Sequence, residues 1–435
     1  MKIITLLTSI LIFSSSIGQE KYTLEDFIGE VLANDFGINI MKKEYQIAQN
    51  ENNIGAAGYL PRISIDAQQD LTINTARLEF LSGDVNEAQN ARNTGFNTGA
   101  FLEWTFFDGF KMFATDKKLD YLEETAQLNL RAEMEMKVYE ASIAFYTLLL
   151  LQEMKEVYEQ SIELSKNRYD YIDRRLNNGA ATKIELIQAQ LDLTADSASY
   201  LSNLREIEEV SSSMNTLLTR SPDSPIQAEG SLPKPDDQLS WEALKEKANT
   251  QNTSILLAKS NIAIRDKEQK EVKSRYYPQL GFYAAYNFAR SENEIGFLRT
   301  NRAYGPSVGL TLRWDILDQL SRYSGMKNAK LQIETSELQE KQEKIFIESE
   351  LRRAYVNYNW SEKNINFELR NQLAIEEIVK ATEQAFETGA ISPLELREVQ
   401  FGIVEARSRL LATQLDYITA KLNIALTVGD FGNMM

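Results

Sequence analysis

Two periodicities alternate along this chain and predict a mixture of long helices and short strands. Apolar residues recur with helical spacing from Leu24 to about Ala57, from about Lys111 to Asn178 and from Thr182 to about Leu218. Between the first two of these segments the spacing falls to every second residue, which is typical of a strand. The middle segment contains no proline, so at about 1.5 Å per residue it predicts a nearly continuous helix roughly 100 Å long.

Four strands are predicted, in two pairs. The first begins after Tyr59-Leu60-Pro61 and the second runs from Phe96 to about Phe107, and we expect residues 73 to 95 between them to form a long polar loop. The second pair covers Gln279 to Phe288 and Gly305 to Asp315. Apolar and polar side chains alternate in each strand, so each has one apolar and one polar face.

The whole plan occurs twice. Tyr59-Leu60-Pro61 corresponds to Tyr276-Tyr277-Pro278 at an offset of 217, whereas Trp104 corresponds to Trp314 at an offset of 210. The first strand hairpin is therefore 217 − 210 = 7 residues longer than the second. Self-similarity over so long a period indicates a duplicated structural unit.

Each pair of long helices is joined by a turn of the same chemistry. The two turns read Asn-Gly-Ala-Ala-Thr-Lys-Ile-Glu-Leu from residue 178 and Thr-Gly-Ala-Ile-Ser-Pro-Leu-Glu-Leu from residue 388. The glycine ends one helix, because it enters the left-handed conformation without a Cβ clash. The Thr or Ser caps the next helix, and the Glu three residues later completes a capping box. We predict that these turns are the tips of two helical hairpins, formed by Gly179, Ala180, Thr182, Gly389, Ala390 and Ser392.

The return helix of each hairpin carries a seam with steps of three and four residues. In the second repeat the seam runs from Leu396 to Ile424 and is almost wholly apolar. In the first repeat it runs from Leu186 to Met214, and polar residues such as Asp196 and Asn203 interrupt it. A seam of this kind packs helices side by side as in a coiled coil, and ordinary bundle packing is the alternative.

Composition excludes several classes of function. A net charge of −16 offers nothing that would neutralise nucleic-acid phosphates. The absence of cysteine excludes disulfides, thiol chemistry and a lipid anchor on cysteine, and the absence of histidine excludes Ser-His-Asp and Cys-His catalysis. The sequence also has no glycine-rich phosphate loop or metal-ligand cluster. We therefore expect no enzyme, no catalytic residue, no metal and no cofactor.

The N-terminus has the pattern of a secretory signal. Lys2 supplies the charge, Ile3 to Phe13 is nearly all apolar, and Ser16-Ile17-Gly18 offers small residues for cleavage before Gln19. No later stretch has the 18 or more apolar residues of a membrane helix. The chain is therefore expected to be exported without a helical membrane anchor.

In an exported chain the strands favour an outer-membrane barrel. Strands of about ten residues with one apolar and one polar face match a barrel with a wet lumen. The alternative is a soluble antiparallel sheet whose apolar face packs on the helices. Four strands cannot close a channel, so a barrel requires oligomerisation to remove the sheet edges. Aromatic residues at the strand ends would form an interfacial girdle of Tyr59, Trp104, Tyr276 and Trp314.

The predicted organisation follows from these features. It comprises a signal peptide at 1–18, a first repeat at 19–220, a proline-rich linker at 221–238 and a second repeat at 239–435, with barrel segments at 60–108 and 277–316.

These features resemble the TolC-like outer membrane efflux proteins. The resemblance is carried by a Tyr-Leu-Pro strand start, a Trp-Thr-Phe-Phe-Asp-Gly strand end, a long helix and a Gly-x-x-Thr-x-x-Glu-Leu tip, in a duplicated chain. It covers essentially the whole mature chain. It implies a mainly helical homotrimer with a twelve-stranded outer-membrane β-barrel and a periplasmic α-barrel of long helical hairpins. It also implies a periplasmic adaptor (membrane fusion) protein, an inner-membrane transporter reached through that adaptor, and outer membrane lipid as partners.

The resemblance further implies a gate at the tips. Relatives carry acidic residues after the tip glycine that form carboxylate rings at the tunnel entrance, and the matching positions here are Glu395 and Glu398. The first tip has Glu185 and Gln188 at the same spacings, and capping alone accounts for Glu185. Glu398 has no capping role, so it is the first candidate, with a solvated helix face as the alternative. Ile391 replaces a basic residue that helps close the entrance in some relatives, which leaves the closing mechanism open.

The predicted function is therefore a passive outer membrane duct of a tripartite export system. Small-molecule efflux is the expected task, and a duct for type I protein secretion is the alternative. An exported coiled-coil protein without a pore is the alternative from another class.

Overall fold

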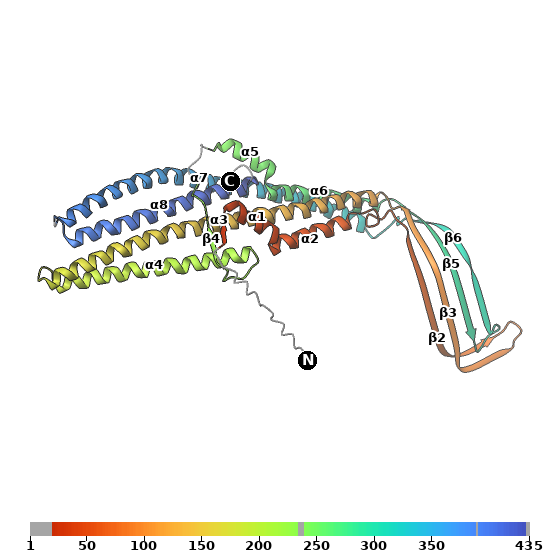
Figure 1. The fold of residues 1–435 in the computed structure, drawn as a ribbon. Helices are drawn as coiled ribbons and strands as arrows, with labels where there is room; N and C mark the ends of the chain where they lie inside the picture. Colours follow the sequence, from red (N-terminus) through yellow and green to blue (C-terminus); the bar gives the residue numbers. More distant parts are fainter. Residues whose placement is uncertain (1–19, 234–238, 389, 432–435) are drawn as a thin grey trace, which may run out of the picture. The chain divides into compact units, whose positions relative to one another are not determined.

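The chain folds into long helices and two small sheets. The computed structural model describes residues 20–233, 239–388 and 390–431, so the expected signal peptide lies outside the described residues. The elements, shown in Figure 1, are β1 (Glu20–Tyr22), α1 (Leu24–Asn34), α2 (Phe36–Glu51), β2 (Arg62–Glu79), β3 (Val85–Phe107), α3 (Lys111–Asn177), α4 (Lys183–Leu217), β4 (Ile226–Ala228), α5 (Trp241–Gln251), α6 (Thr253–Ser274), β5 (Gln279–Asn293), β6 (Thr300–Arg313), α7 (Ser321–Glu387) and α8 (Pro393–Val428). The expected mainly helical fold with four long strands is confirmed.

Two compact units make up the chain. One, the sheet unit, comprises Lys43–Asn129 and Leu256–Glu343, and the other, the hairpin unit, comprises the rest. Each unit draws on both sequence repeats. Within the described residues, no helix combines the length and the apolar run that crossing a membrane requires.

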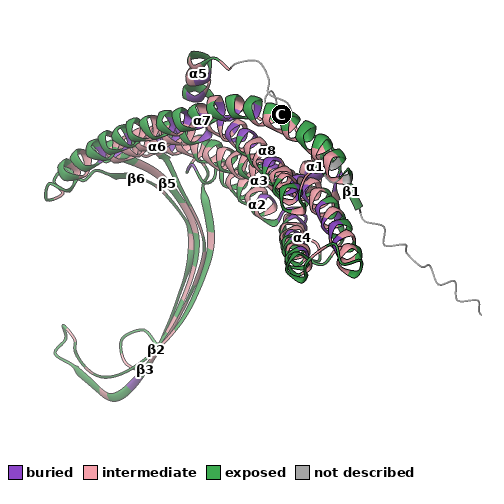
Figure 2. Ribbon diagram, turned by 90° about the vertical axis from the view of Figure 1, so that its left-hand side faces the viewer, coloured by how far each residue is buried: buried purple, intermediate pink, exposed green. Residues whose placement is uncertain are grey.

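The sheet unit is built on one antiparallel sheet in the order β2-β3-β5-β6 (Figure 1). Residues that are partners across the strands form rows, such as the apolar row of Ile63, Leu102, Ala284 and Val308. Because the apolar residues of the four strands align in such rows, one face of the sheet is largely apolar. Most of the sheet is exposed in the single chain, as Figure 2 shows. The edge strands are β2 and β6, and neither has a second neighbour among the described residues.

The strands are longer than the sequence predicted. The polar loop expected at 73–95 is wrong, because β2 continues to Glu79 and β3 begins at Val85, with a short turn between them. In this turn the Phe80 N–H donates to the Asp84 carbonyl (2.8 Å). The outer part of the hairpin lacks apolar alternation, but ladder hydrogen bonds join backbone groups whatever the side chains are. A hydrophobicity pattern therefore missed it.

The helix expected from Leu24 to about Ala57 is also wrong, because it is broken between α1 and α2. The Asp35 carboxylate accepts a hydrogen bond from the Ile38 N–H (3.0 Å) at the start of α2. Between α5 and α6, the Asn252 side chain accepts from the Ile255 N–H at the same distance. Capping by a side-chain oxygen allows a helix to restart without glycine or proline. The spacing of apolar residues marks neither position, although Gly37 follows the first break.

The hairpin unit contains two equivalent cores. One gathers Phe27, Val31 and Met214, all fully buried, and the other gathers their counterparts Leu244, Ala248 and Ile424. The expected linker also contributes structure, since β4 lies within it and pairs in parallel with β1. Residues 234–238 of the linker lie outside the described residues.

A tight turn leads from strand β3 into helix α3. The Met112 N–H donates to the Asp108 carboxylate (2.9 Å), and Asp318 caps α7 in the same way through the Arg322 N–H (3.0 Å). Gly109 in the first turn has φ +73°, and a Cβ there would lie 2.4 Å from the Ser274 carbonyl oxygen. Both the backbone conformation and the close approach of α6 thus require glycine at this position.

We predict that Gly109→Ala destabilises the protein much more than Gly179→Ala. Gly179 has φ +74° but open space around it, so alanine there costs only the left-handed backbone penalty of about 1 kcal/mol. At Gly109 a backbone carbonyl must also move. Thermal unfolding in detergent, followed by circular dichroism, measures both variants. Equal shifts in Tm would show that the approach of Ser274 does not constrain the turn.

Candidate functional site

The two hairpin tips have the turn geometry that the sequence predicted. Gly179 is left-handed, and the Ala180 N–H donates to the Arg175 carbonyl (2.8 Å). In the second tip the Ala390 N–H donates to the Ala385 carbonyl at the same distance. Gly389 itself lies outside the described residues. In both tips, the helix before the turn therefore ends with a hydrogen bond between backbone groups five residues apart.

Both capping boxes are present. In the first, the Glu185 N–H donates to the Thr182 hydroxyl (3.2 Å) and the Thr182 N–H donates to the Glu185 carboxylate (2.6 Å). In the second, Ser392 and Glu395 make the same two bonds at 3.3 and 2.7 Å. The backbone N–H of the capping residue, followed by its hydroxyl, lowers the pKa of each glutamate. Both tips therefore carry ionised carboxylates at neutral pH.

The residues expected at the gate all lie on the exposed surface near the tips. Glu185, Gln188, Glu395 and Glu398 are exposed in the single chain. Glu395 and Glu398 lie three residues apart on α8, so they share one side of its first turns. The side chain of Ile391 is half-buried at the same tip.

The aromatic residues expected at the membrane interface form two matched contacts in the sheet unit. The indole N–H of Trp104 donates to the Tyr59 carbonyl (2.9 Å), and that of Trp314 donates to the Tyr276 carbonyl (3.3 Å). Both indoles remain about half exposed. An indole with its N–H satisfied and its ring outside is suited to a boundary between water and hydrocarbon.

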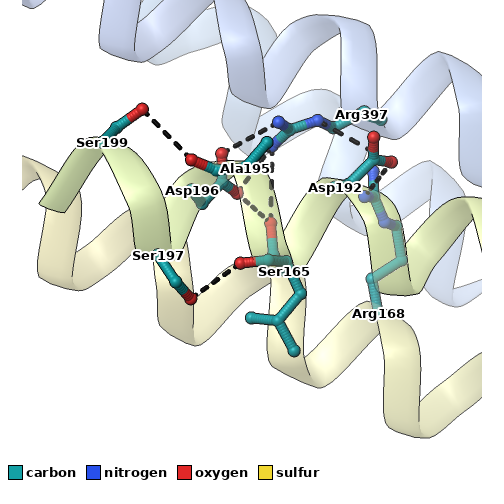
Figure 3. Close-up of polar contacts among 9 residues, drawn as sticks. Ser165, Arg168, Asp192, Ala195, Asp196, Ser197, Ser199 and Arg397 are labelled. Carbon is teal, nitrogen blue, oxygen red and sulfur yellow. Dashed lines mark hydrogen bonds and ion pairs between the residues drawn. The ribbon is translucent and has the colours of Figure 1, made fainter. Parts of the chain in front are cut away.

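An ion-pair cluster in the hairpin unit joins the two hairpins (Figure 3). Arg397 on α8 donates to both oxygens of Asp196 on α4, at 2.8 and 2.9 Å. Ser165 on α3 donates to the same carboxylate. One turn along α4, Asp192 pairs with Arg168 of α3, and its carboxylate lies 3.9 Å from Arg397 Nε. The cluster therefore ties α8 to the opposite hairpin through a bidentate pair.

The cluster is withdrawn from water. The side chain of Arg168 is 2% exposed and that of Asp196 is 12% exposed. Burial lowers the pKa of Arg168, opposed by the neighbouring Asp192 carboxylate. The Nε and Nη1 atoms of Arg168 have no hydrogen-bond partner in the part of the chain that the structure describes. Separating these helices would expose or unpair buried charges, which is strongly destabilising.

Sequence reasoning missed this cluster, although a signal was present. The hydrophobic pattern indicates Asp196 only as an interruption of the first seam. At the offset of 210 its counterpart is Ala406, and the counterparts of Ser165 and Arg168 are Ile375 and Ile378. At these three positions the first repeat has a charged or polar residue and the second repeat has an apolar one. Comparing the repeats position by position would have found it.

The other polar interruption of the seam is buried as well. Asn203 is 4% exposed, and no described residue makes a hydrogen bond to its Oδ1. It lines a cavity of about 370 Å³ between α3, α4 and α8, together with residues such as Tyr158 and Leu411. Among the described residues, no group of acidic side chains is arranged to hold a metal ion.

The chain matches a known protein family and is similar to several solved structures. A family described as outer membrane efflux protein matches residues 27–218 and 244–430. The chain is similar to the solved outer-membrane channel OprN, with TM-score 0.76, 16% identity, and coverage of 93% of this chain and 89% of that one. It is also similar to the outer membrane channel CmeC of Campylobacter jejuni, with TM-score 0.77, 15% identity, and coverage of 93% and 85%. The outer membrane protein VceC of Vibrio cholerae is similar with TM-score 0.74 and 13% identity. The match covers 94% of this chain and 96% of that one. No curated protein sequence matches the chain significantly.

We predict that Asp196→Ala destabilises the hairpin unit by about 3 kcal/mol, because it removes the bidentate partner of Arg397 and leaves only the longer contact with Asp192. The double variant Asp196→Ala/Arg397→Met should lose less, since no charge is then left unpaired. Glu209→Ala is the matched control, because it breaks an exposed pair with Arg205 on the same helix and should cost under about 1 kcal/mol. Chemical unfolding in detergent measures all three. A double variant as unstable as the single one would contradict the prediction.

Proposed function

Because this chain belongs to the outer membrane efflux protein family, we propose that three copies of it form the outer-membrane duct of a tripartite export system. The family consists of outer membrane channels, so the protein is a channel-type protein of the outer membrane and not an enzyme. The proposal concerns its oligomeric state, its partners, its gate and its cargo.

The open sheet is the observation that carries the proposal. In a bilayer, every unpaired backbone group at a sheet edge costs several kcal/mol, so a membrane sheet must close on itself. The edges β2 and β6 belong to the same chain, so the β6 edge of one copy can pair with the β2 edge of the next. Such a head-to-tail contact generates a ring.

An open lumen requires at least three copies, and the family resemblance supports three. Two copies would give 2 × 4 = 8 strands, and side chains fill the interior of an eight-stranded barrel. Three copies give 3 × 4 = 12 strands, which leave room for an open lumen. The face opposite the apolar one would line it, and it carries polar residues such as Ser64, Asp66, Asn97 and Thr311.

Exposed apolar residues on the helices also support assembly. Trp360 and Phe367 on α7 are 63% and 67% exposed, and Leu394 and Phe401 on α8 are 66% and 56% exposed. Each pair is seven residues apart, which is the spacing of a coiled-coil seam. A large apolar stripe left open on one chain marks a surface that another chain covers. Neighbouring copies of the same hairpins are the partners that a ring provides.

The tips would form the gate and the docking surface. Three copies of Glu395 and Glu398 around one axis would make carboxylate rings that attract cations and hinder anions. Glu185 and Gln188 would occupy the matching positions of the first tip. The tip residues, Gly179, Ala180, Thr182, Gly389, Ala390 and Ser392, would contact a periplasmic adaptor, which links the duct to an inner-membrane transporter.

Small molecules are the proposed cargo. Isolation of the duct with its native adaptor and transporter, followed by transport assays, identifies the cargo directly. A partner transporter dedicated to a secreted protein would replace efflux by type I protein secretion. A detergent-free monomer would instead support the coiled-coil protein without a pore.

We predict that Ser64→Cys/Ser307→Cys yields covalent trimers when treated with a flexible bismaleimide. The two cysteines lie on the edge strands β2 and β6, and the natural chain contains no other thiol. A matched control is Asn97→Cys/Ala289→Cys, because these residues are partners on the inner strands. It should cross-link within one chain and run as a monomer on a denaturing gel. Monomers alone from the edge variant would contradict closure by neighbouring copies.

We predict that Glu398→Ala raises anion conductance or weakens block by divalent cations in a planar bilayer, because it removes one carboxylate ring. Gln188→Ala is the control, since it occupies the same spacing after the first tip without a charge. It should leave ion selectivity unchanged. If selectivity and block are the same for Glu398→Ala and the natural protein, Glu398 is not part of the gate.

A further inference from the structure

Two arginines stand opposite each other on the apolar face of the sheet. Arg290 of β5 and Arg302 of β6 are register partners. The rows before them on the same face pair Phe282 with Leu310, Ala284 with Val308, Tyr286 with Pro306 and Phe288 with Tyr304. Like charges directly opposite in an antiparallel pair destabilise a sheet. The arrangement therefore needs a compensating negative charge from elsewhere.

The depth of the pair indicates where that charge comes from. Leu280 and Arg290 are ten residues apart on one strand. At about 3.3 Å per residue and a tilt of about 40° this distance spans about 25 Å, the height of a barrel's apolar band. Phe96, Phe288 and Tyr304 lie beside the arginines, and the Phe96 and Phe288 rings are in edge contact at 6.2 Å. In the proposed barrel, with the apolar band starting at Leu280, the pair would lie at the headgroup level, above an aromatic girdle.

Only part of this charge is neutralised within the chain. Arg290 pairs with Glu292, one row further out on the same face. Arg302 has no ion pair with any described residue, and the same holds for Arg92 and Arg299. Glu294, the other carboxylate here, accepts a hydrogen bond from the Arg92 backbone N–H (2.8 Å).

An open hollow of about 870 Å³ begins one row further out, at the Glu292 and Thr300 pair. Arg92, Glu292, Glu294, Arg299 and Thr300 are among its lining residues. The surface thus combines an apolar face for acyl chains with guanidinium groups beyond its end. The hollow beside Arg92 and Arg299 has room for a lipid headgroup.

We propose that Arg290 and Arg302, with Arg92 and Arg299 beside them, bind the phosphate groups of lipids in the outer leaflet of the outer membrane. This inference rests on the proposed barrel. A guanidinium matches phosphate oxygens with two parallel hydrogen bonds. An arginine on the lipid face costs little at the interface but about 2–4 kcal/mol at the midplane. The pair therefore also fixes the height of the sheet in the bilayer.

Arg302→Gln tests the proposal, because Arg302 makes no ion pair whose loss would disturb the fold. The purified protein in a neutral maltoside detergent is titrated with bisphosphorylated lipid A, and its thermal stability reports binding. Phosphate-free lipid A and inorganic phosphate are the other ligands. Arg313→Gln is the matched control, since Arg313 lies on the same strand but on the opposite face.

Arg302→Gln should not lower the thermal stability of the lipid-free protein, but it should weaken the binding of lipid A. Without lipid the variant is at least as stable as the natural protein, because the repulsion with Arg290 is gone. With bisphosphorylated lipid A its affinity falls about tenfold or more, the loss expected for one charge-assisted contact. Arg313→Gln should keep the natural affinity, and phosphate-free lipid A should bind weakly to every variant.

Three results would overturn the inference while leaving the trimer intact. They are equal affinity for lipid A in Arg302→Gln and the natural protein, loss of stability in the variant without lipid, and full stabilisation by inorganic phosphate alone. A natural protein that forms no trimer in detergent would instead contradict the proposed barrel itself.

Discussion

The hydrogen-bonding needs of the sheet backbone constrain the rest of this protein. Strands β2, β3, β5 and β6 form a continuous hydrogen-bonded sheet, but the outer sides of β2 and β6 have no partner strand among the described residues. In water these groups would be hydrated, whereas an apolar face that contacts lipid puts them where no water is available. In the proposed ring, copies of the same chain supply the missing partners. The oligomer is then a condition for stability in the membrane and not an addition to a stable monomer.

Several contacts occur in equivalent form in both repeats, whereas the ion-pair cluster occurs only once among the described residues. The two cores of the hairpin unit use equivalent positions, and so do the Trp104 and Trp314 contacts and the two capping boxes. The ion-pair cluster does not, because Asp196 and Arg397 correspond to Ala406 and Ile187. The pair places Arg397 of α8 against Asp196 of the first hairpin, and separating the two would leave buried charges unpaired.

Several parts of the fold and the site were predictable, because they depend on neighbouring residues. The capping boxes need only a residue and the one three positions later, and the duplication is visible by comparing offsets. The break at Asp35 and the strands through residues 73–95 were not predictable from periodicity. The first depends on one side chain replacing a helical hydrogen bond, and the second depends on backbone pairing between polar segments. Hydrophobic patterning carries neither signal.

The sequence by itself determined the alternation of long helices with two strand pairs, the tips, the two faces of the strands and the family resemblance, since all of these are local or repeated patterns. Only the tertiary structure decided that Arg397 meets Asp196, 201 residues away, and that Arg290 stands opposite Arg302. Contacts of this kind depend on the register of one strand or helix against another. A shift of one residue would turn each side chain to the other face of its strand. Register is a property of the packed chain, and no single segment carries it.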